Sequence, residues 1–238
     1  MRRVRALIIC LAAGTAAVSA FSGAPAATSP LLDRFLVRDS EAGPARYRAL
    51  RHLEAKNARF GASAWMDVWT DFDESAGLRY EIASESGSGQ IRRRVFRAAL
   101  EGEQKLWQDK QPQQSGFTHS NYMFEEGGSE GALETIGITP RRKDVLLVQG
   151  RLLVKPDDGD LMRVEGRLSK TPSFWTRRVE VVRRYGRVGG AHVPLEIEST
   201  AQVLLAGPST FRMTYEYESI NGQSVGAPQP RLAPASNR

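Results

Sequence analysis

Residues that could bind a metal ion are few and scattered along this 238-residue sequence. The three histidines, His52, His119 and His192, do not occur at the spacing of a metal-binding motif. Three aspartates lie close together within residues 157–160, but they lack the ligand spacing and the closing glutamate of a calcium-binding loop and are typical of a hairpin turn. The sequence therefore predicts no metal site and no bound cofactor.

Patterns typical of nucleophilic catalysis are missing as well. The sequence contains no G-x-S-x-G, S-x-x-K or H-E-x-x-H motif. Ser169 and Lys170 are adjacent, so on a strand their side chains would point to opposite faces. The Ser-Gly segment 86–89 has neither the length nor the lysine of a phosphate-binding loop. We therefore predict a protein without catalytic residues, and an exported enzyme with an unrecognised site stays open as an alternative.

Arginines are concentrated at two places, a run at residues 92–94 with Arg97 close by, and the pair 141–142. Such groups can bind anionic lipid or an acidic protein surface. On a helix, however, three consecutive arginines spread over most of a turn, which favours a solvated face. The formal net charge of +6 falls to +3 without the three arginines of the first five residues, and scattered charges of this size argue against a nucleic-acid partner.

The N-terminal segment has the organisation of an export signal. A basic stretch at residues 1–5 precedes the uncharged apolar run 6–21, and the small residues at 24–26 match a signal-peptidase site. Residues 1–26 are therefore predicted to be a cleaved signal peptide, which indicates a periplasmic protein; an uncleaved inner-membrane anchor is the alternative. Cys10 is the only cysteine, so the mature chain has none. The mature chain is not expected to span the membrane, because it has no further apolar run of sufficient length.

Helical and strand-like segments alternate in the first half of the mature chain. Apolar residues at helical spacing predict two helices, at residues 44–57 and 90–107. Between them, residues 62–72 and 78–84 have the pattern of a strand hairpin. The polar segment 109–131, rich in glycine, glutamine and serine, is predicted to be a long loop or an insertion.

Trp65 and Trp69 alternate with Asp67 and Asp71 along the strand predicted at residues 62–72. The positions between them are mostly apolar, so this strand is either covered on both faces or lines a cavity on one. Packing in the core and contact with a ligand both remain open for the two tryptophans.

The second half of the chain predicts an antiparallel meander of five long strands. They are expected at residues 145–154, 161–170, 174–188, 191–205 and 209–219. Each strand has one apolar face and one face that carries charges of both signs, so one face of the sheet must be buried. Helices are the available cover. The predicted fold class is therefore α+β, a long curved antiparallel sheet, or half-barrel, wrapped around two or three helices.

Both ends of the mature chain are expected to lie outside the folded domain. Residues 27–42 are predicted to be an irregular lead-in. Residues 223–238 contain three prolines among small and polar residues and are predicted to be a disordered tail. A single domain is therefore placed at residues 43–222.

Two stretches of the second half resemble, in amino-acid sequence, a family of uncharacterised exported bacterial proteins. They are Leu161–Thr200 and Ser209–Gly222. Together with the order of the elements, they resemble the periplasmic lipoprotein-localisation (LolA-like) carrier superfamily. The resemblance implies an apolar cavity between the concave face of the sheet and its helices. In the carriers this cavity receives the acyl chains of lipoproteins, and in a relative it serves as a sensor of lipids or stray lipoproteins.

The predicted function is therefore a binding protein that holds an acyl chain, a lipid or a lipidated protein in this cavity. The residues expected to line it are Leu146, Val148, Val164, Val181, Leu195, Ile197, Met213, Tyr215, Trp65 and Trp69. Burial of an acyl chain contributes about 0.8 kcal/mol per methylene, so binding requires no catalytic group. The expected partner is a lipid or an acylated protein, and a membrane-associated protein is a further candidate.

The alternative function is that of a periplasmic sensor or interaction protein. In that case its own side chains fill the core, and the polar segment 109–131 or the arginine-bearing helix contacts a protein partner. The same alternation of apolar residues specifies an open cavity and a filled core. The sequence leaves both functions open.

Overall fold

Strands make up most of the fold, and its helices lie on one face of the sheet that they form. The computed structural model describes residues 29–41, 43–109, 114–172, 176–204 and 207–232. The helical segments are α1 (Pro30–Glu41), α2 (Gly89–Ile91), the π-helical η1 (Arg92–Arg97) and α3 (Ala98–Gln108). The strands are β1 (Arg46–Asn57), β2 (Ala62–Asp73), β3 (Gly77–Gly87), β4 (Tyr122–Glu130), β5 (Leu133–Pro140), β6 (Val148–Val154), β7 (Leu161–Leu168), β8 (Thr176–Val188), β9 (Ala191–Val203), β10 (Gly207–Ile220) and β11 (Gln223–Ser224).

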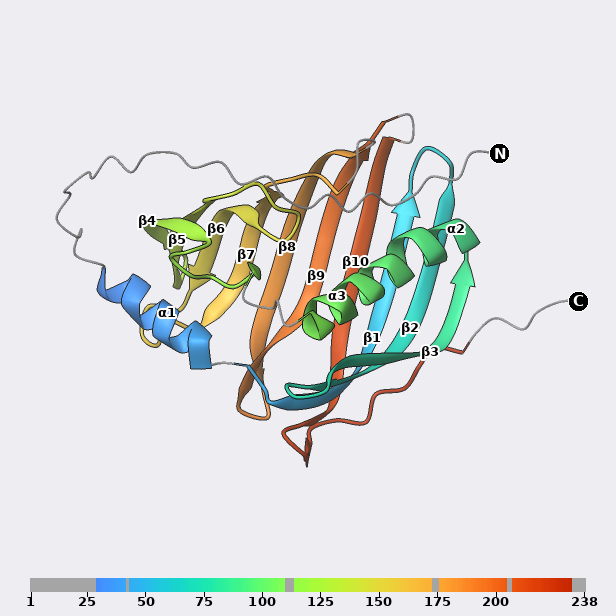
Figure 1. The fold of residues 1–238 in the computed structure, drawn as a ribbon, viewed down its shortest axis with the longest axis horizontal. Coiled ribbons are helices and arrows are strands. Elements are labelled where there is room, and N and C mark those ends of the chain that lie inside the picture. The colour runs from blue at the N-terminus through green and yellow to red at the C-terminus, as the bar shows by residue number, and fades with distance from the viewer. Residues whose placement is uncertain (1–28, 42, 110–113, 173–175, 205–206, 233–238) are drawn as a thin grey trace, which may run out of the picture.

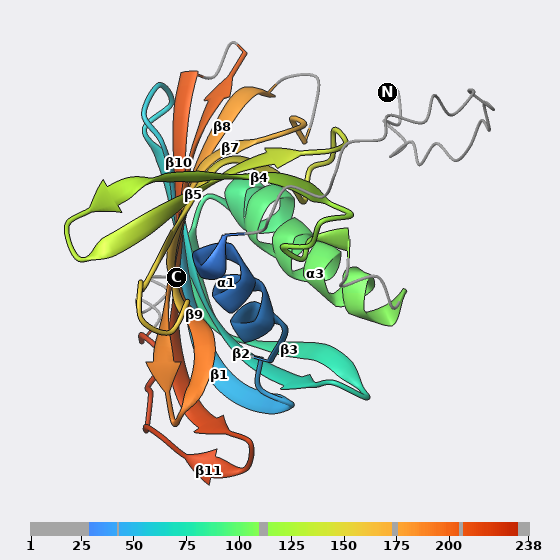
Figure 2. The same cartoon turned by 90° about the vertical axis from the view of Figure 1, so that its left-hand side faces the viewer.

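The strands follow one another in the order β3-β2-β1-β10-β9-β8-β7-β6-β5-β4, and the short β11 pairs with β10. The sheet is strongly curled, and α1 and α3 lie on the same side of it, which we call the concave face (Figure 1, Figure 2). The opposite side is the convex face. β3 and β4 end the path of paired strands without joining each other. The predicted fold class, an α+β half-barrel around helices, is confirmed.

Most of the elements predicted from the sequence are present. The five predicted meander strands are β6 to β10, and the predicted hairpin is β2 and β3. The helix expected at residues 90–107 corresponds to the continuous segment α2-η1-α3. Two predicted strand ends, 174–175 and 205, lie outside the described residues, as does the predicted signal peptide.

The helix predicted at residues 44–57 is wrong, because this segment contains β1. β1 pairs with β2 on one side and with β10 on the other. Leu53 is buried beneath α3, and Leu50, on the convex face, is fully buried as well. A central strand that is covered on both faces need not alternate between apolar and polar residues. The three-residue spacing of its apolar side chains therefore does not indicate a helix.

The irregular lead-in predicted at residues 27–42 is also wrong, because it contains α1. Pro30 occupies the first turn, where a backbone N–H would have no acceptor within the helix, so the N–H that proline lacks is not needed. The side chain of Ser29 accepts a hydrogen bond from the Leu31 N–H at 3.2 Å, as at a capped helix start. Leu32 and Phe35 are buried against the sheet. The proline thus marks a helix start, and the folded domain begins before residue 43.

The segment 109–131 is not a loop throughout, since β4 occupies its second part and pairs with β5. β4 lies at the end of the strand order, and most of its side chains from Glu125 onward are exposed. An edge strand has one partner strand and tolerates polar residues, which explains why its sequence is typical of a loop.

Each of the two long helical segments covers its own buried apolar cluster. The α1 cluster takes its buried residues mainly from α1 and from β4 to β7, and includes Phe35 and Val164. The α3 cluster takes its buried residues from β1, β2, β10 and the helix, and includes Phe96. β8 and β9 contribute only the partly buried Tyr185 and Ile197 to these two clusters. The apolar core of the concave face is therefore divided.

Residues 223–232 do not form the predicted disordered tail, because they pack against the convex face. Arg231 donates from Nη2 to Asp67 Oδ1 at 2.6 Å and from Nη1 to Glu54 Oε1 at 2.5 Å. Its guanidinium lies 4.6 Å from the centre of the Trp65 ring. Asp67 is fully buried, so it requires a countercharge that the tail supplies. Residues 233–238 lie outside the described residues.

Asp160 attaches α1 to the sheet. Its side chain is 2% exposed and binds Arg38 Nε of α1 at 2.9 Å and Arg187 Nε of β8 at 2.6 Å. The hydrogen bonds from Arg187 and Arg38 hold the pKa of the Asp160 carboxyl far below its ordinary value, although burial opposes this shift. This buried carboxylate therefore fixes the position of α1.

We expect Asp160→Asn to lower the free energy of unfolding by about 2–3 kcal/mol at pH 7, because two arginines lose their shared countercharge. The folded-state pKa of Asp160 is lowered, so this contribution is present above about pH 4 and is lost as the pH falls toward the folded-state value. Urea unfolding at pH 7 and pH 3 measures it, with the exposed Asp157→Asn as the control. A loss of equal size at both pH values would contradict the proposed role of the charge.

We expect Arg231→Ala to destabilise the fold by about 2–3 kcal/mol, because the buried Asp67 carboxylate loses its main cationic partner. The matched control is Arg178→Ala, since the ion pair of Arg178 with Glu180 is exposed on both sides and should contribute less than about 0.5 kcal/mol. Urea unfolding of both variants at pH 7 makes the comparison. Equal effects of the two substitutions would mean that residues 223–232 are not held on the convex face.

Candidate functional site

β8 and β9 occupy the concave face between the α1 cluster and the α3 cluster. Strand register places one row of side chains across this region, each paired with the next. We call it the central row, and it consists of Ile136, Leu152, Val164, Arg183, Ile197, Met213, Leu53 and Met66. Arg183 is the one charged residue among them.

Exposure along the central row is greatest in its middle. Val164 is fully buried on the α1 side, and Met213 is 8% exposed on the α3 side. Arg183 and Ile197, which lie between them, are both partly exposed. We define the central strip as the partly exposed concave side chains of Arg183 and Tyr185 on β8, Ile197 on β9 and Tyr215 on β10. Its apolar side chains pack against the edges of the buried clusters and stay partly exposed.

Arg51 is the charged residue beneath α3, and all of its polar contacts are internal. Its side chain is fully buried and binds Glu103 Oε2 of α3 at 2.6 Å. It also donates to Thr70 Oγ1 at 3.1 Å and to the Tyr47 hydroxyl at 2.8 Å. Its guanidinium lies 4.8 Å from the centre of the Tyr215 ring. Arg51 therefore attaches α3 to β1 and is not available to a ligand.

Tyrosine hydroxyls surround the central strip and stay neutral at physiological pH. Burial raises the pKa of Tyr215 and of Tyr217 well above the ordinary range. Burial also raises the pKa of Tyr122, while a hydrogen bond from the Val148 N–H and the charge of Arg183 oppose this rise.

The residues predicted to line a cavity are distributed over both clusters. Val148 and Val164 belong to the buried α1 cluster, and Met213 belongs to the α3 cluster. Ile197 and Tyr215 pack against the α3 cluster but stay partly exposed. The structure therefore places some of the predicted lining within the core and some beside it.

Three further predicted residues lie in different settings. Val181 is buried on β8, one position along the concave face from Arg183. Leu146 is partly buried in the turn before β6, outside any strand. Leu195 is 36% exposed at an irregularity in the pairing of β8 with β9, beside Gly186. Of these, Val181 is the one that borders the central strip.

Trp65 and Trp69 lie on the convex face, so the prediction that they line the concave cavity is wrong. They alternate along β2 with residues such as Val68, which is buried beneath α3. The guanidinium groups of Arg231 and Arg48 lie 4.6 Å from the ring centres of Trp65 and Trp69, respectively. These cation–π contacts cover the outer side of β2. Apolar residues on both faces of this strand reflect its burial on both faces.

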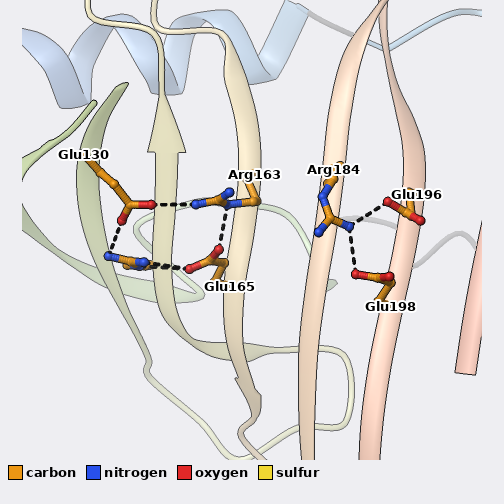
Figure 3. A network of polar contacts seen from close by, with 7 residues as sticks. Glu130, Arg163, Glu165, Arg184, Glu196 and Glu198 are labelled. Atoms are coloured by element: carbon orange, nitrogen blue, oxygen red, sulfur yellow. Dashed lines mark hydrogen bonds and ion pairs between the residues drawn. The ribbon is translucent and has the colours of Figure 1, made fainter. Parts of the chain in front are cut away.

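The rest of the convex face carries ion pairs of alternating sign. Figure 3 shows two groups of them, Glu130, Arg163 and Glu165, and Arg184, Glu196 and Glu198. A pocket of about 420 Å³ on this side has mainly charged and hydroxyl side chains in its lining, among them Glu54, Lys56, Glu180, Glu198, Thr200, Thr210 and Arg212. This pocket lies on the opposite side of the sheet from α1 and α3.

The described histidines have structural contacts. His52 Nδ1 lies 3.0 Å from Asp67, the ring of His119 packs edge-on to Phe124, and the ring of His192 stacks on Tyr185. Within the described ranges, no three His, Cys, Asp or Glu side chains are grouped as a metal site. Of the helices that the structure describes, none has both the length and the apolar character needed to cross a membrane.

Arg183 is not among the residues predicted to line a cavity, although the sequence contains a signal for it. Arg183 and Arg184 are adjacent on a strand, and adjacent side chains point to opposite faces. One of the two must therefore face the apolar side of the sheet. Arg184 pairs with Glu196 and Glu198 on the convex face, which places Arg183 on the concave face.

No protein-family model matches this sequence, and no curated protein matches it either. Solved structures similar to this chain include a DUF1329 family protein from Desulfovibrio piger, with 11% identity, a TM-score of 0.39 and coverage of 79% of this chain and 92% of that chain. They also include a LolA superfamily protein from Nitrosomonas europaea, with 9% identity, a TM-score of 0.40 and coverage of 79% of this chain and 92% of that chain. The fold itself is described by the strands and helices of this chain.

Proposed function

We propose that this protein binds a lipid or the acyl chain of a lipidated protein on the central strip, between α1 and α3, and that it carries out no catalysis. The observation that supports the proposal is the partial exposure of Ile197, Tyr185 and Tyr215 between two buried clusters. An acyl chain in this place would join the two clusters into one apolar layer. The predicted signal peptide places this activity in the periplasm.

The expected affinity follows from the burial of methylene groups. About ten buried methylenes contribute about 8 kcal/mol, at about 0.8 kcal/mol each. Lost translational freedom and chain ordering offset part of this gain. Dissociation constants in the micromolar range or weaker are therefore reasonable for a single chain without any catalytic or covalent contact.

A second candidate is a sensor whose concave face is filled by its own side chains. The complete burial of Val148 and Val164 and the low exposure of Met213 support it, because these predicted lining residues already pack within the clusters. Such a protein would act through a surface contact with a protein partner.

Native mass spectrometry of the protein as its own cells process it distinguishes the two candidates. We expect one added mass that is lost on delipidation, together with renewed uptake of a fluorescent fatty-acid probe by the delipidated protein. A bare protein mass and no uptake of the probe would contradict lipid binding and favour the sensor.

We expect Ile197→Gln to weaken binding of the same probe about five- to tenfold, because a polar side chain replaces an apolar contact in the central strip. The control is Val182→Gln, a comparable change on the convex face of β8. Fluorescence titration of both variants gives their dissociation constants. The proposed location is wrong if the two variants bind the probe equally well.

A further inference from the structure

Arg183 lies at the centre of an apolar row and has no ion-pair partner among the residues that the structure describes. Its Nε atom is buried and has no hydrogen-bond partner. Among the residues that the structure describes, no carboxylate lies within ion-pair distance of its guanidinium and no hydrogen bond to it forms. Its register neighbours on the flanking strands are Val164 and Ile197.

Three acidic groups near the concave face are already engaged, whereas the partly buried Asp39 of α1 forms no ion pair among the described residues. Glu103 binds Arg51, Glu85 binds Arg92 and Arg97, and Asp160 binds Arg38 and Arg187. The neighbouring Arg184, on the convex face, has both Glu196 and Glu198. The described part of the chain thus supplies a countercharge for these arginines and leaves Arg183 without one.

A partly buried charge without a partner is unfavourable, because it loses water and gains no compensating contact. A bound anion would reverse this balance through charge-assisted hydrogen bonds to the guanidinium. The anion must carry an apolar chain, because its surroundings are Val164, Val181 and Ile197.

We propose that the ligand of the central strip is an anionic amphiphile, and that Arg183 binds its negatively charged headgroup while the chain lies on the apolar strip. This inference rests on the proposed lipid binding and adds the charge of the ligand to it. A carboxylate and a phosphate monoester share the required chemistry, since both accept two hydrogen bonds from a guanidinium.

Paired probes of equal chain length test the proposal on the delipidated protein at pH 8. Oleate is compared with oleyl alcohol, and oleoyl lysophosphatidate with monoolein, by competition with a fluorescent fatty-acid probe. We expect each anionic probe to bind at least tenfold more tightly than its neutral partner. The stronger of the two preferences identifies carboxylate or phosphate as the natural headgroup.

Substitutions then assign the preference to one residue. We expect Arg183→Met to lose the tenfold preference for oleate over oleyl alcohol. Arg183→Lys should retain most of the preference, and Arg184→Met, the adjacent residue on the convex face, should retain all of it. Arg183→Met is also expected to have a thermal midpoint no lower than the wild type, because it removes an unpaired charge.

The possible failures are distinguishable. If the wild type binds anionic and neutral probes equally, the role of Arg183 is wrong and lipid binding stands. If Arg183→Met keeps the preference, another group binds the headgroup and the inference is likewise overturned. If the wild type binds none of the four probes, the proposed function and the inference fail together.

Discussion

The width of the sheet is the constraint on which the rest of this structure depends. Ten strands about 4.8 Å apart form a face roughly 43 Å wide. A helix with its side chains is about 10–12 Å wide, which is much narrower than this face. Two helical segments therefore cannot bury the whole concave face, and each buries the apolar residues at its own end. The partly exposed strip on β8 and β9 lies between these two covered regions.

Buried charges determine where the two helices lie. Asp160 binds Arg38 of α1, and Arg51 of β1 binds Glu103 of α3. Buried ion pairs add little net stability, because desolvation cancels much of the attraction, but they strongly disfavour any arrangement that separates the partners. The two pairs hold the helices apart on either side of the central strip. The strip is thus maintained by polar contacts that lie outside it.

The turn and alternation signals of the second half of the chain were sufficient to predict the meander, because each strand there has one wet and one dry face. The same signals fail for β1, because it is buried on both faces and its apolar residues do not alternate. They also fail for α1, because Pro30 is as typical of a loop as of the first turn of a helix. The face on which Trp65 lies could not be predicted, because the side chain that packs over its ring is Arg231, more than 160 residues away in the sequence. A contact between residues so far apart leaves no local sequence pattern. The adjacent arginines Arg183 and Arg184 do leave one, because neighbouring side chains on a strand point to opposite faces.

Two adjacent arginines of β8 differ in whether they form ion pairs with the described residues. On the convex face Arg184 meets two glutamates, so that face is neutralised by the chain itself. On the concave face Arg183 occupies a position where an apolar residue would extend the row from Val164 to Ile197 and join the two clusters. A core that served stability alone would favour the apolar residue there, because an unpaired charge has an unfavourable free energy of burial. Local inconsistency of this kind is expected where a protein binds something, since a binding site sacrifices stability for recognition.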